Sequence, residues 1–230
     1  MKRFYKEAKA AKGEDGFAVL LDGKNLRTPG GQFLILPNLR LAESIAEEWQ
    51  AQKDDIRPAT MPLMQLTATV LDHLSSQRAA MTERLLSCVE TDVLCLRAET
   101  PPELRVHQEK HWQPPLDWLK KTHGIELKTG LGLKAPRLSS AAQAAFERKL
   151  SAFDNWVFMG VYEAAAGSGS LVLALALYEK ELNAQQVFEL AELERIFQAQ
   201  KWGSDAEMEK RRNAVRAELA VIERWFGLLC

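Results

Sequence analysis

Two histidines stand four residues apart in the segment His107-Gln108-Glu109-Lys110-His111. On a helix this spacing puts both imidazoles on one face, where they could clip a metal ion. The metalloprotease pattern has Glu directly after the first His, whereas Gln108 stands there, and the sequence offers no evident third ligand. We expect surface histidines, and a metal site is the alternative.

The chain has three cysteines, Cys88, Cys95 and Cys230, and none belongs to a C-x-x-C pair. Free thiols in a reducing compartment are the simplest account of an odd number. Cys88 and Cys95 lie in apolar surroundings with no identifiable partner base, so we expect buried structural thiols. A nucleophilic Cys95 is the alternative.

The run Gly167-Ser168-Gly169-Ser170 precedes an apolar segment and could cradle a phosphate on the free N–H groups of a helix N-terminus. It lacks the lysine of a P-loop and the strand that should precede one. We expect a tight turn between two helices, with Ser168 or Ser170 as the cap of the second helix.

The hydrophobic fraction of 47% and charged fraction of 27% are those of an ordinary globular protein. The formal net charge of −1 argues against a general binder of nucleic acid or anionic membranes. The N-terminal segment lacks the apolar core of a secretory signal and carries Glu7, Glu14 and Asp15, unlike a transit peptide. We expect a cytoplasmic, bacterial protein.

The first part of the sequence favours an antiparallel meander. Asp22-Gly23 is a hairpin signal between apolar runs, because both residues tolerate positive φ. The three expected strands span residues 17–21, 25–28 and 32–36. Ala42, Ile45, Ala46 and Trp49 then repeat at helical spacing over residues 39–52, with Glu43, Glu47 and Glu48 expected on the outer face. This helix should cover the sheet.

Two helices, residues 63–74 and 77–89, and a strand over residues 92–98 that returns to the sheet should complete the N-terminal part. We place the domain boundary at Thr100-Pro101-Pro102, which gives an N-terminal domain of residues 1–100 and a C-terminal helical domain of residues 101–230. In the second part Pro114-Pro115 should bend or break the first helix. The expected elements there are a helix 103–123, a strand 125–129 and helices 139–153, 155–166, 170–178, 183–202 and 205–228.

The segment from Ser170 to Tyr178 is apolar at nearly every position, so as a helix it has no solvent face. It is too short to span a membrane, which takes roughly 20 residues. We predict that it is the central helix of the second domain. The fold class is therefore α+β, a small N-terminal antiparallel sheet domain with a covering helix, followed by a larger orthogonal all-α domain.

The order of motifs resembles the ATP synthase assembly chaperones that serve the alpha subunit, the ATP-twelve family. The matching blocks cover nearly the whole chain: RFYKEA (3–8), GFAVLLDGKNLRTP (16–29), LILP (34–37), LAESIAEEWQAQ (41–52), Ile56 to Pro62, TDVLCLRA (91–98), HWQPPLDW (111–118), GSGSLVLALAL (167–177) and QAQKWG (198–203). No single block is diagnostic, and the set together is fairly specific.

The resemblance implies a binding protein without catalysis. Its partner would be the unassembled alpha subunit of the catalytic head, held until it meets the beta subunit. It implies no nucleotide or metal cofactor, and we expect a monomer with no stable membrane insertion. The chain departs from the family's acidic pattern, because Gln200 stands where we expect a carboxylate and Arg195 and Ile196 also replace expected acids.

Six tryptophans are many for a chain of this size, and Trp202, beside the helix-ending Gly203, is the one we expect to be exposed and suited to partner binding. The predicted partner-facing residues are Glu194, Gln198, Lys201, Trp202 and Asp205. These residues could instead only fix the turn between two helices. The competing functions are an enzyme that uses the His107/His111 face or a reactive Cys95, and a general holdase for unfolded chains.

Overall fold

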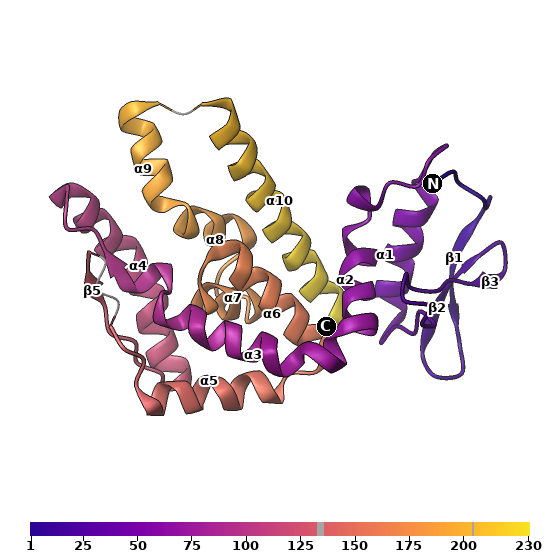
Figure 1. Cartoon of the computed structure of the whole chain (residues 1–230), viewed down its shortest axis with the longest axis horizontal. Helices are drawn as coiled ribbons and strands as arrows, with labels where there is room; N and C mark the ends of the chain where they lie inside the picture. Colours follow the sequence, from indigo (N-terminus) through magenta and orange to yellow (C-terminus); the bar gives the residue numbers. More distant parts are fainter. Residues whose placement is uncertain (133–135, 204) are drawn as a thin grey trace. The chain divides into compact units, whose positions relative to one another are not determined.

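The structure is a computed structural model that describes residues 1–132, 136–203 and 205–230 (Figure 1). The chain divides into two compact units. The first contains residues 1–78, 155–159 and 224–230, and the second contains residues 79–154 and 160–223. The fold is α+β, as the sequence predicts, with one small antiparallel sheet and helices through most of the remaining chain.

The sheet of the first unit has three strands in the order β1-β2-β3, all antiparallel: β1 (Ala8–Lys12), β2 (Phe17–Leu21) and β3 (Lys24–Asn25). Asp22 and Gly23 have φ values of 47° and 80°, so the hairpin prediction is confirmed. The third predicted strand is wrong, because residues 32–36 pair only through the isolated bridges Phe17↔Leu36 and Arg27↔Phe33. Strand β1 replaces it, pairing Ala8 with Leu21 through Lys12 with Phe17.

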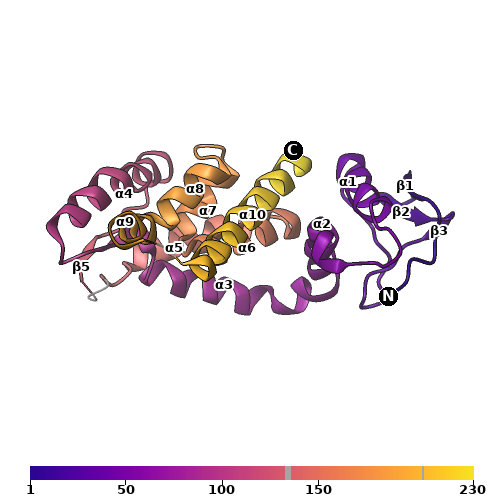
Figure 2. The same cartoon turned by 90° about the horizontal axis from the view of Figure 1, so that it is seen from above.

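Helix α1 (Leu39–Gln50) packs against β1 and β2 and covers the sheet, as predicted (Figure 2). Asn38 caps it by accepting the N–H of Leu41 at 2.9 Å. Glu48 is not on the outer face: it is 8% exposed. Its two carboxylate oxygens accept the backbone N–H groups of Leu63 and Met64, each at 2.9 Å. One helix therefore caps the N-terminus of the next, where backbone donors lack intrahelical partners.

Residues 62–90 form one continuous helical segment instead of the two predicted helices. Helix α2 (Pro62–Thr69) passes through a π-helical turn (Val70–Leu74) into α3 (Ser75–Glu90). The predicted break at residues 75–76 has no glycine or proline to cause it. The returning strand is also wrong, since a 3₁₀ turn (Val93–Cys95) leads into the short β4 (Leu96–Arg97), which pairs in parallel with β5 (Gly130–Leu131) in a separate sheet.

The second unit is helical. Its remaining elements are α4 (Pro102–His123), α5 (Ser140–Ala152), α6 (Asn155–Ser168), α7 (Leu171–Tyr178), α8 (Ala184–Ala191), α9 (Leu193–Trp202) and α10 (Ala206–Leu229). Helices α3, α6 and α10 also give residues to the first unit. The sequence predicts a bend or break at Pro114 and Pro115, and α4 continues through them without a break. Residues 125–129 are not a strand, contrary to the prediction.

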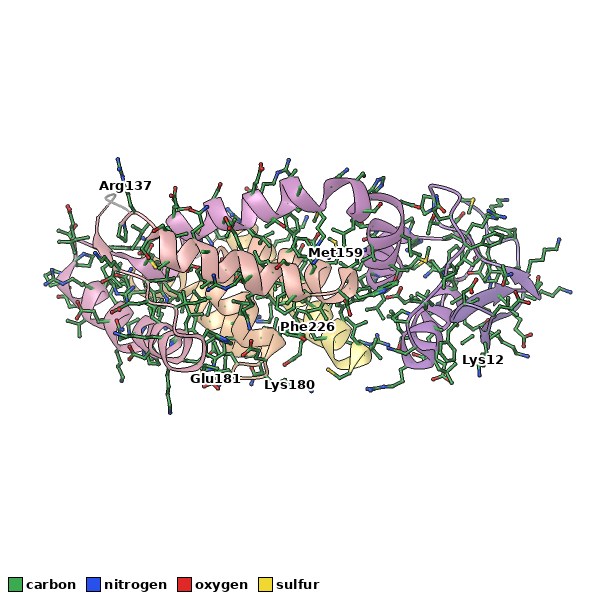
Figure 3. All side chains as sticks on the ribbon, turned by 90° about the horizontal axis from the view of Figure 1, so that it is seen from below. Lys12, Arg137, Met159, Lys180, Glu181 and Phe226 are labelled. Carbon is green, nitrogen blue, oxygen red and sulfur yellow. The ribbon has the colours of Figure 1, made fainter. Side chains whose placement is uncertain are left out.

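Helix α7 is the centre of the second unit, as the sequence predicts. Every residue from Leu171 to Leu177 is buried, and the helix packs against α4 and α8. It lies in the middle of this unit in Figures 1 and 2. The turn after it contains Lys180 with a φ of 62°, and Figure 3 labels Lys180 and Glu181 there. Asn183 then caps α8 with the full capping box through Gln186.

The boundary between the compact units falls after Arg78, so residue 100 lies inside the second unit. Whether residues 1–100 and 101–230 are independent domains stays a prediction. In the part of the chain that the structure describes, we find no helix that combines the length and hydrophobicity needed to cross a bilayer.

Candidate functional site

The predicted partner-facing residues lie at α9 and the start of α10. Helix α9 begins at Leu193, after Glu192, and ends where the N–H of Gly203 donates to the carbonyl of Ala199 at 2.9 Å. Gly203 has a φ of 82°, a conformation that side-chain-bearing residues rarely adopt. The predicted stop at this glycine is confirmed, but the single helix predicted over residues 183–202 is wrong, because the structure has two helices there, α8 and α9, which are separated at Glu192.

Glu194, Gln198 and Trp202 follow each other at intervals of four residues, so they share one side of α9. The side chain of Trp202 is 72% exposed, which agrees with the expectation from its position beside Gly203. Gln198 and Lys201 are also exposed, and the Lys201 ammonium lies 4.7 Å from the ring centroid of Phe197. The end of α9 thus presents an indole, an amide and an ammonium to solvent.

Two members of the predicted set have structural roles. Glu194 is half-buried and accepts a hydrogen bond from the side-chain amide of Gln108, which is fully buried and itself accepts the N–H of Ala98 at 2.7 Å. Asp205 is exposed and caps α10, because its Oδ1 accepts the N–H of Met208 at 2.7 Å. Glu194 therefore connects α9 to α4 and Asp205 caps α10, while Gln198, Lys201 and Trp202 project from the last turns of α9. Whether these five residues bind a partner or only fix the turn stays a prediction.

A groove of about 800 Å³, which the sequence analysis missed, lies between α4, α8, α9 and α10. Helix α9 contributes Leu193 and Ile196 to it, and none of the predicted partner-facing residues lines it. The guanidinium of Arg216, on α10, lies 4.3 Å from the ring centroid of Phe188 along its wall. Its lining combines α4 with the three consecutive helices α8, α9 and α10, and α4 lies about 60 residues or more before them in the sequence, so no local motif signals the groove.

His107 and His111 line this groove with their ring centroids 4.5 Å apart, so the predicted juxtaposition on one helix face is confirmed. Burial, followed by the neighbouring His111, lowers the pKa of His107. The described residues contain no cluster of three or more His, Cys, Asp or Glu side chains that could hold a metal ion. Among the described residues, the two histidines therefore have no third side chain beside them that could complete a metal site.

Cys95 is 2% exposed, and burial, followed by the nearby Asp92 carboxylate, raises its pKa to about 12. The thiol is therefore protonated at neutral pH, whereas a nucleophilic cysteine needs a lowered pKa and access to solvent. Burial also raises the pKa of Cys88. The expectation of a buried structural thiol holds for Cys95, and a reactive Cys95 is contradicted, whereas Cys88 is only half-buried.

The Gly167–Ser170 turn is not a phosphate site, because the carboxylate of Asp92 already lies at the N-terminus of α7. Ser170 caps α7 by accepting the N–H of Leu173 at 3.0 Å, and its hydroxyl donates to Asp92 Oδ2 at 2.9 Å. Asp92 is 0% exposed, and burial raises its pKa to about 6. The prediction of a tight turn between two helices is therefore confirmed, and the phosphate-binding alternative is wrong.

Comparison with known proteins gives a consistent result. The sequence model of the ATP12 chaperone protein family matches residues 2–120. The chain is 23% identical over 216 residues to protein atp12, mitochondrial, of Schizosaccharomyces pombe, covering 88% of this chain and 74% of that protein.

Solved structures agree over the whole chain. The crystal structure of Atp12 from Paracoccus denitrificans has a TM-score of 0.95 at 31% identity, covering 100% of this chain and 98% of that one. The structure of Atu1473 from Agrobacterium tumefaciens has a TM-score of 0.92 at 35% identity, covering 99% and 85%. The family is one of chaperones and not of enzymes. The chain accordingly belongs to the ATP12 family of ATP synthase assembly chaperones.

Proposed function

We propose that this chaperone binds the unassembled alpha subunit of the ATP synthase catalytic head and covers its subunit interface until beta arrives. Membership of the ATP12 chaperone family supports the assembly role. The alpha subunit is the partner that the resemblance of its sequence blocks implies. We further propose that it acts in the cytoplasm as a monomer.

The observation that carries the proposed contact is the exposure of Trp202. A tryptophan that is 72% exposed leaves a large apolar ring in water, at the end of a helix and beside the exposed Lys201 and Gln198. Tryptophan is enriched among the residues that dominate binding energies at protein interfaces. We infer that the alpha subunit contacts this end of α9, with Trp202 as the central anchor.

The physical need for such a contact lies in the client. A subunit that buries a large apolar surface in its complex exposes this surface while alone, and exposed apolar patches aggregate. A chaperone that binds only the unassembled form lowers the concentration of free sticky surface by mass action. Release then requires only that beta binds alpha more tightly.

The test is a titration of the isolated alpha subunit against the purified chain, followed by calorimetry. We expect a one-to-one complex, and we expect Trp202→Ala to weaken it by about 2 kcal/mol or more, which is at least about 30-fold. Val106→Ala is the matched control, because Val106 is an exposed apolar residue on α4, 61% exposed, outside the proposed contact.

The two parts of the proposal fail separately. If alpha does not bind the wild-type chain in any assay with beta absent, the chaperone–alpha assignment is abandoned. If alpha binds and Trp202→Ala binds equally well, the assignment stands and the contact at the end of α9 is wrong.

A further inference from the structure

The first unit contains an apolar groove of about 890 Å³, a volume in the range of ligand-binding clefts. Its walls come from the N-terminal segment, the β2–β3 hairpin with the residues after it, α1 and α2. The buried side chains that form its floor include Tyr5, Leu21, Leu26, Trp49, Ile56 and Met64. At its edge Phe4 is 64% exposed, so apolar surface continues from the floor into solvent.

Trp49 lines this groove with an indole ring that is packed into the fold. The residue is 8% exposed, and its indole Nε1 is buried with no acceptor among the described residues. The backbone carbonyl of Trp49 accepts the hydroxyl of Tyr5 at 2.7 Å, and the two rings meet edge to face with centroids 5.5 Å apart. Buried indole N–H groups usually have a partner, and one without a partner has lost its water without compensation.

The charges on the edge of the groove are mainly positive. Lys24 and Arg27 line it and are exposed, and Arg27 lies over the ring of Phe33 with its guanidinium carbon 3.8 Å from the centroid. Asp22 also lines it, but its carboxylate already accepts the backbone N–H groups of Lys6 and Glu7 at 2.9–3.1 Å. These hydrogen bonds lower the pKa of Asp22, and they engage its carboxylate with the backbone of the N-terminal segment.

We propose that this groove binds an apolar peptide segment that carries an acidic residue, presented by a client protein. The apolar side chains of the segment fill the floor, and its carboxylate faces Lys24 and Arg27. A hydrocarbon ligand would leave the exposed ammonium of Lys24 without a counter-charge, whereas an acidic residue supplies a carboxylate. Apart from Met1, the residues that line the groove lie within the segment that matches the family.

This site goes beyond the function proposed above. The groove lies in the first compact unit, whereas the end of α9 lies in the second. Its test uses neither the alpha subunit nor Trp202, so the outcomes of the two tests are independent.

The test selects a displayed library of random short peptides on the full chain and then titrates the enriched peptides by fluorescence anisotropy. We expect enrichment of apolar sequences that contain Asp or Glu. Lys24→Ala removes an exposed ammonium from the edge of the groove, so the affinity for acidic peptides should fall by about 2- to 5-fold, the value of one exposed ion pair.

Two further surface variants test the charge preference and the apolar edge of the groove. Lys24→Glu should reverse the preference, weakening acidic peptides and strengthening matched basic ones, more strongly at low salt. Phe4→Ala should weaken all enriched peptides, and Ile35→Ala is its control, since Ile35 is an exposed apolar residue, 42% exposed, that does not line the groove.

Three results would overturn the proposal. One is a selection that enriches no peptide, and another is enrichment without acidic residues that is indifferent to Lys24→Glu. The last is a dimer of the free chain in sedimentation that Phe4→Ala dissociates, because this would assign the groove to a second copy.

Discussion

At the scale of the residue, Asp92 is the group with the clearest consequence for stability. It is fully buried, accepts hydrogen bonds from Ser170 and from the N–H of Leu94, and still has a pKa raised to about 6 by burial. The folded chain therefore binds a proton that the unfolded chain releases near its ordinary pKa of 3.8. The stabilisation is complete below the unfolded pKa and is lost as pH rises through the folded pKa.

We predict that the free energy of unfolding falls, by about 3 kcal/mol from this group, as pH rises from about 4 to above 6. Asp92→Asn cannot ionise, so its pH dependence in this range should be flatter than that of the wild-type chain. Urea denaturation at a series of pH values measures it. The pKa values of Glu48 and Glu163 are also raised by burial, so only the difference between the two curves is assigned to Asp92.

Asp117→Asn is the control, since Asp117 is exposed on α4 and its replacement should leave the curve unchanged. Parallel curves for the wild-type chain and Asp92→Asn would show that the buried carboxylate does not titrate in this range.

Residue-scale prediction from sequence succeeded where one side chain decides the outcome. The predicted cap Ser170 is present, and Ser139 and Asn183, where two predicted helices begin, also cap helices, because a short polar side chain satisfies the first N–H groups of a helix locally. Glu48 shows the limit. Its charge indicates the surface, but its partners are the N–H groups of a helix that begins 14 residues later, which periodicity within α1 cannot reveal.

At the scale of the element, the end of α9 depends on Gly203. Its φ of 82° and ψ of 170° lie in a region that is essentially open only to glycine. We predict that Gly203→Ala destabilises the end of α9 by about 1–3 kcal/mol, because the added Cβ strains the backbone although nothing lies within 4 Å of it. Hydrogen exchange of the amides around Ala199 should become faster.

Gly167→Ala is the control, because its expected effect on stability has the opposite sign. Gly167 lies near the end of α6 with nothing within 4 Å of an added Cβ and no positive φ, so alanine should be neutral or stabilising by up to about 1 kcal/mol. Equal effects of the two substitutions on exchange would contradict the assignment to backbone strain.

Long periodic elements were predicted well and short strands poorly. Helices α1, α4 and α10 carry enough apolar repeats to fix their buried faces, and α7 is recognisable because it is apolar throughout. Strand β1 has the sequence AKAAK, which lacks the β-branched and aromatic residues that mark strands, and pairing with β2 alone makes it one. The apolar QFLIL segment carries those marks but forms only isolated bridges.

At the scale of the whole molecule, the first unit is not a continuous piece of chain. Trp225 is 0% exposed, donates its indole N–H to the carbonyl of Trp156 at 3.0 Å, and belongs with Trp156 to the first unit. Asn38 and Arg40 donate to the carbonyls of Leu228 and Cys230 at 2.9 and 2.7 Å. Sequence analysis draws boundaries between neighbours in the chain and cannot find a unit assembled from three separate segments.

We predict that a fragment of residues 1–100 is less stable than the same residues in the full chain, because it lacks residues 155–159 and 224–230. In the full chain, Trp225→Ala should lower the free energy of unfolding by about 3–5 kcal/mol through the cavity it leaves. Chemical denaturation measures both.

Cys230→Ala is the control for the C-terminal segment, because the side chain of Cys230 is exposed and only its backbone carbonyl binds Arg40. A fragment of residues 1–100 whose sheet amides are as protected as in the full chain would support the boundary at residue 100 as a folding boundary.

The first unit can be completed only late in synthesis, because it includes residues 224–230. Residues 1–78 leave the ribosome on the order of 10 s before residues 224–230, at about 5–20 residues per second. During this interval the surface of residues 1–78 that later packs against residues 224–230 is exposed to solvent. We therefore expect the first unit to reach its full stability only after residues 224–230 have been synthesised.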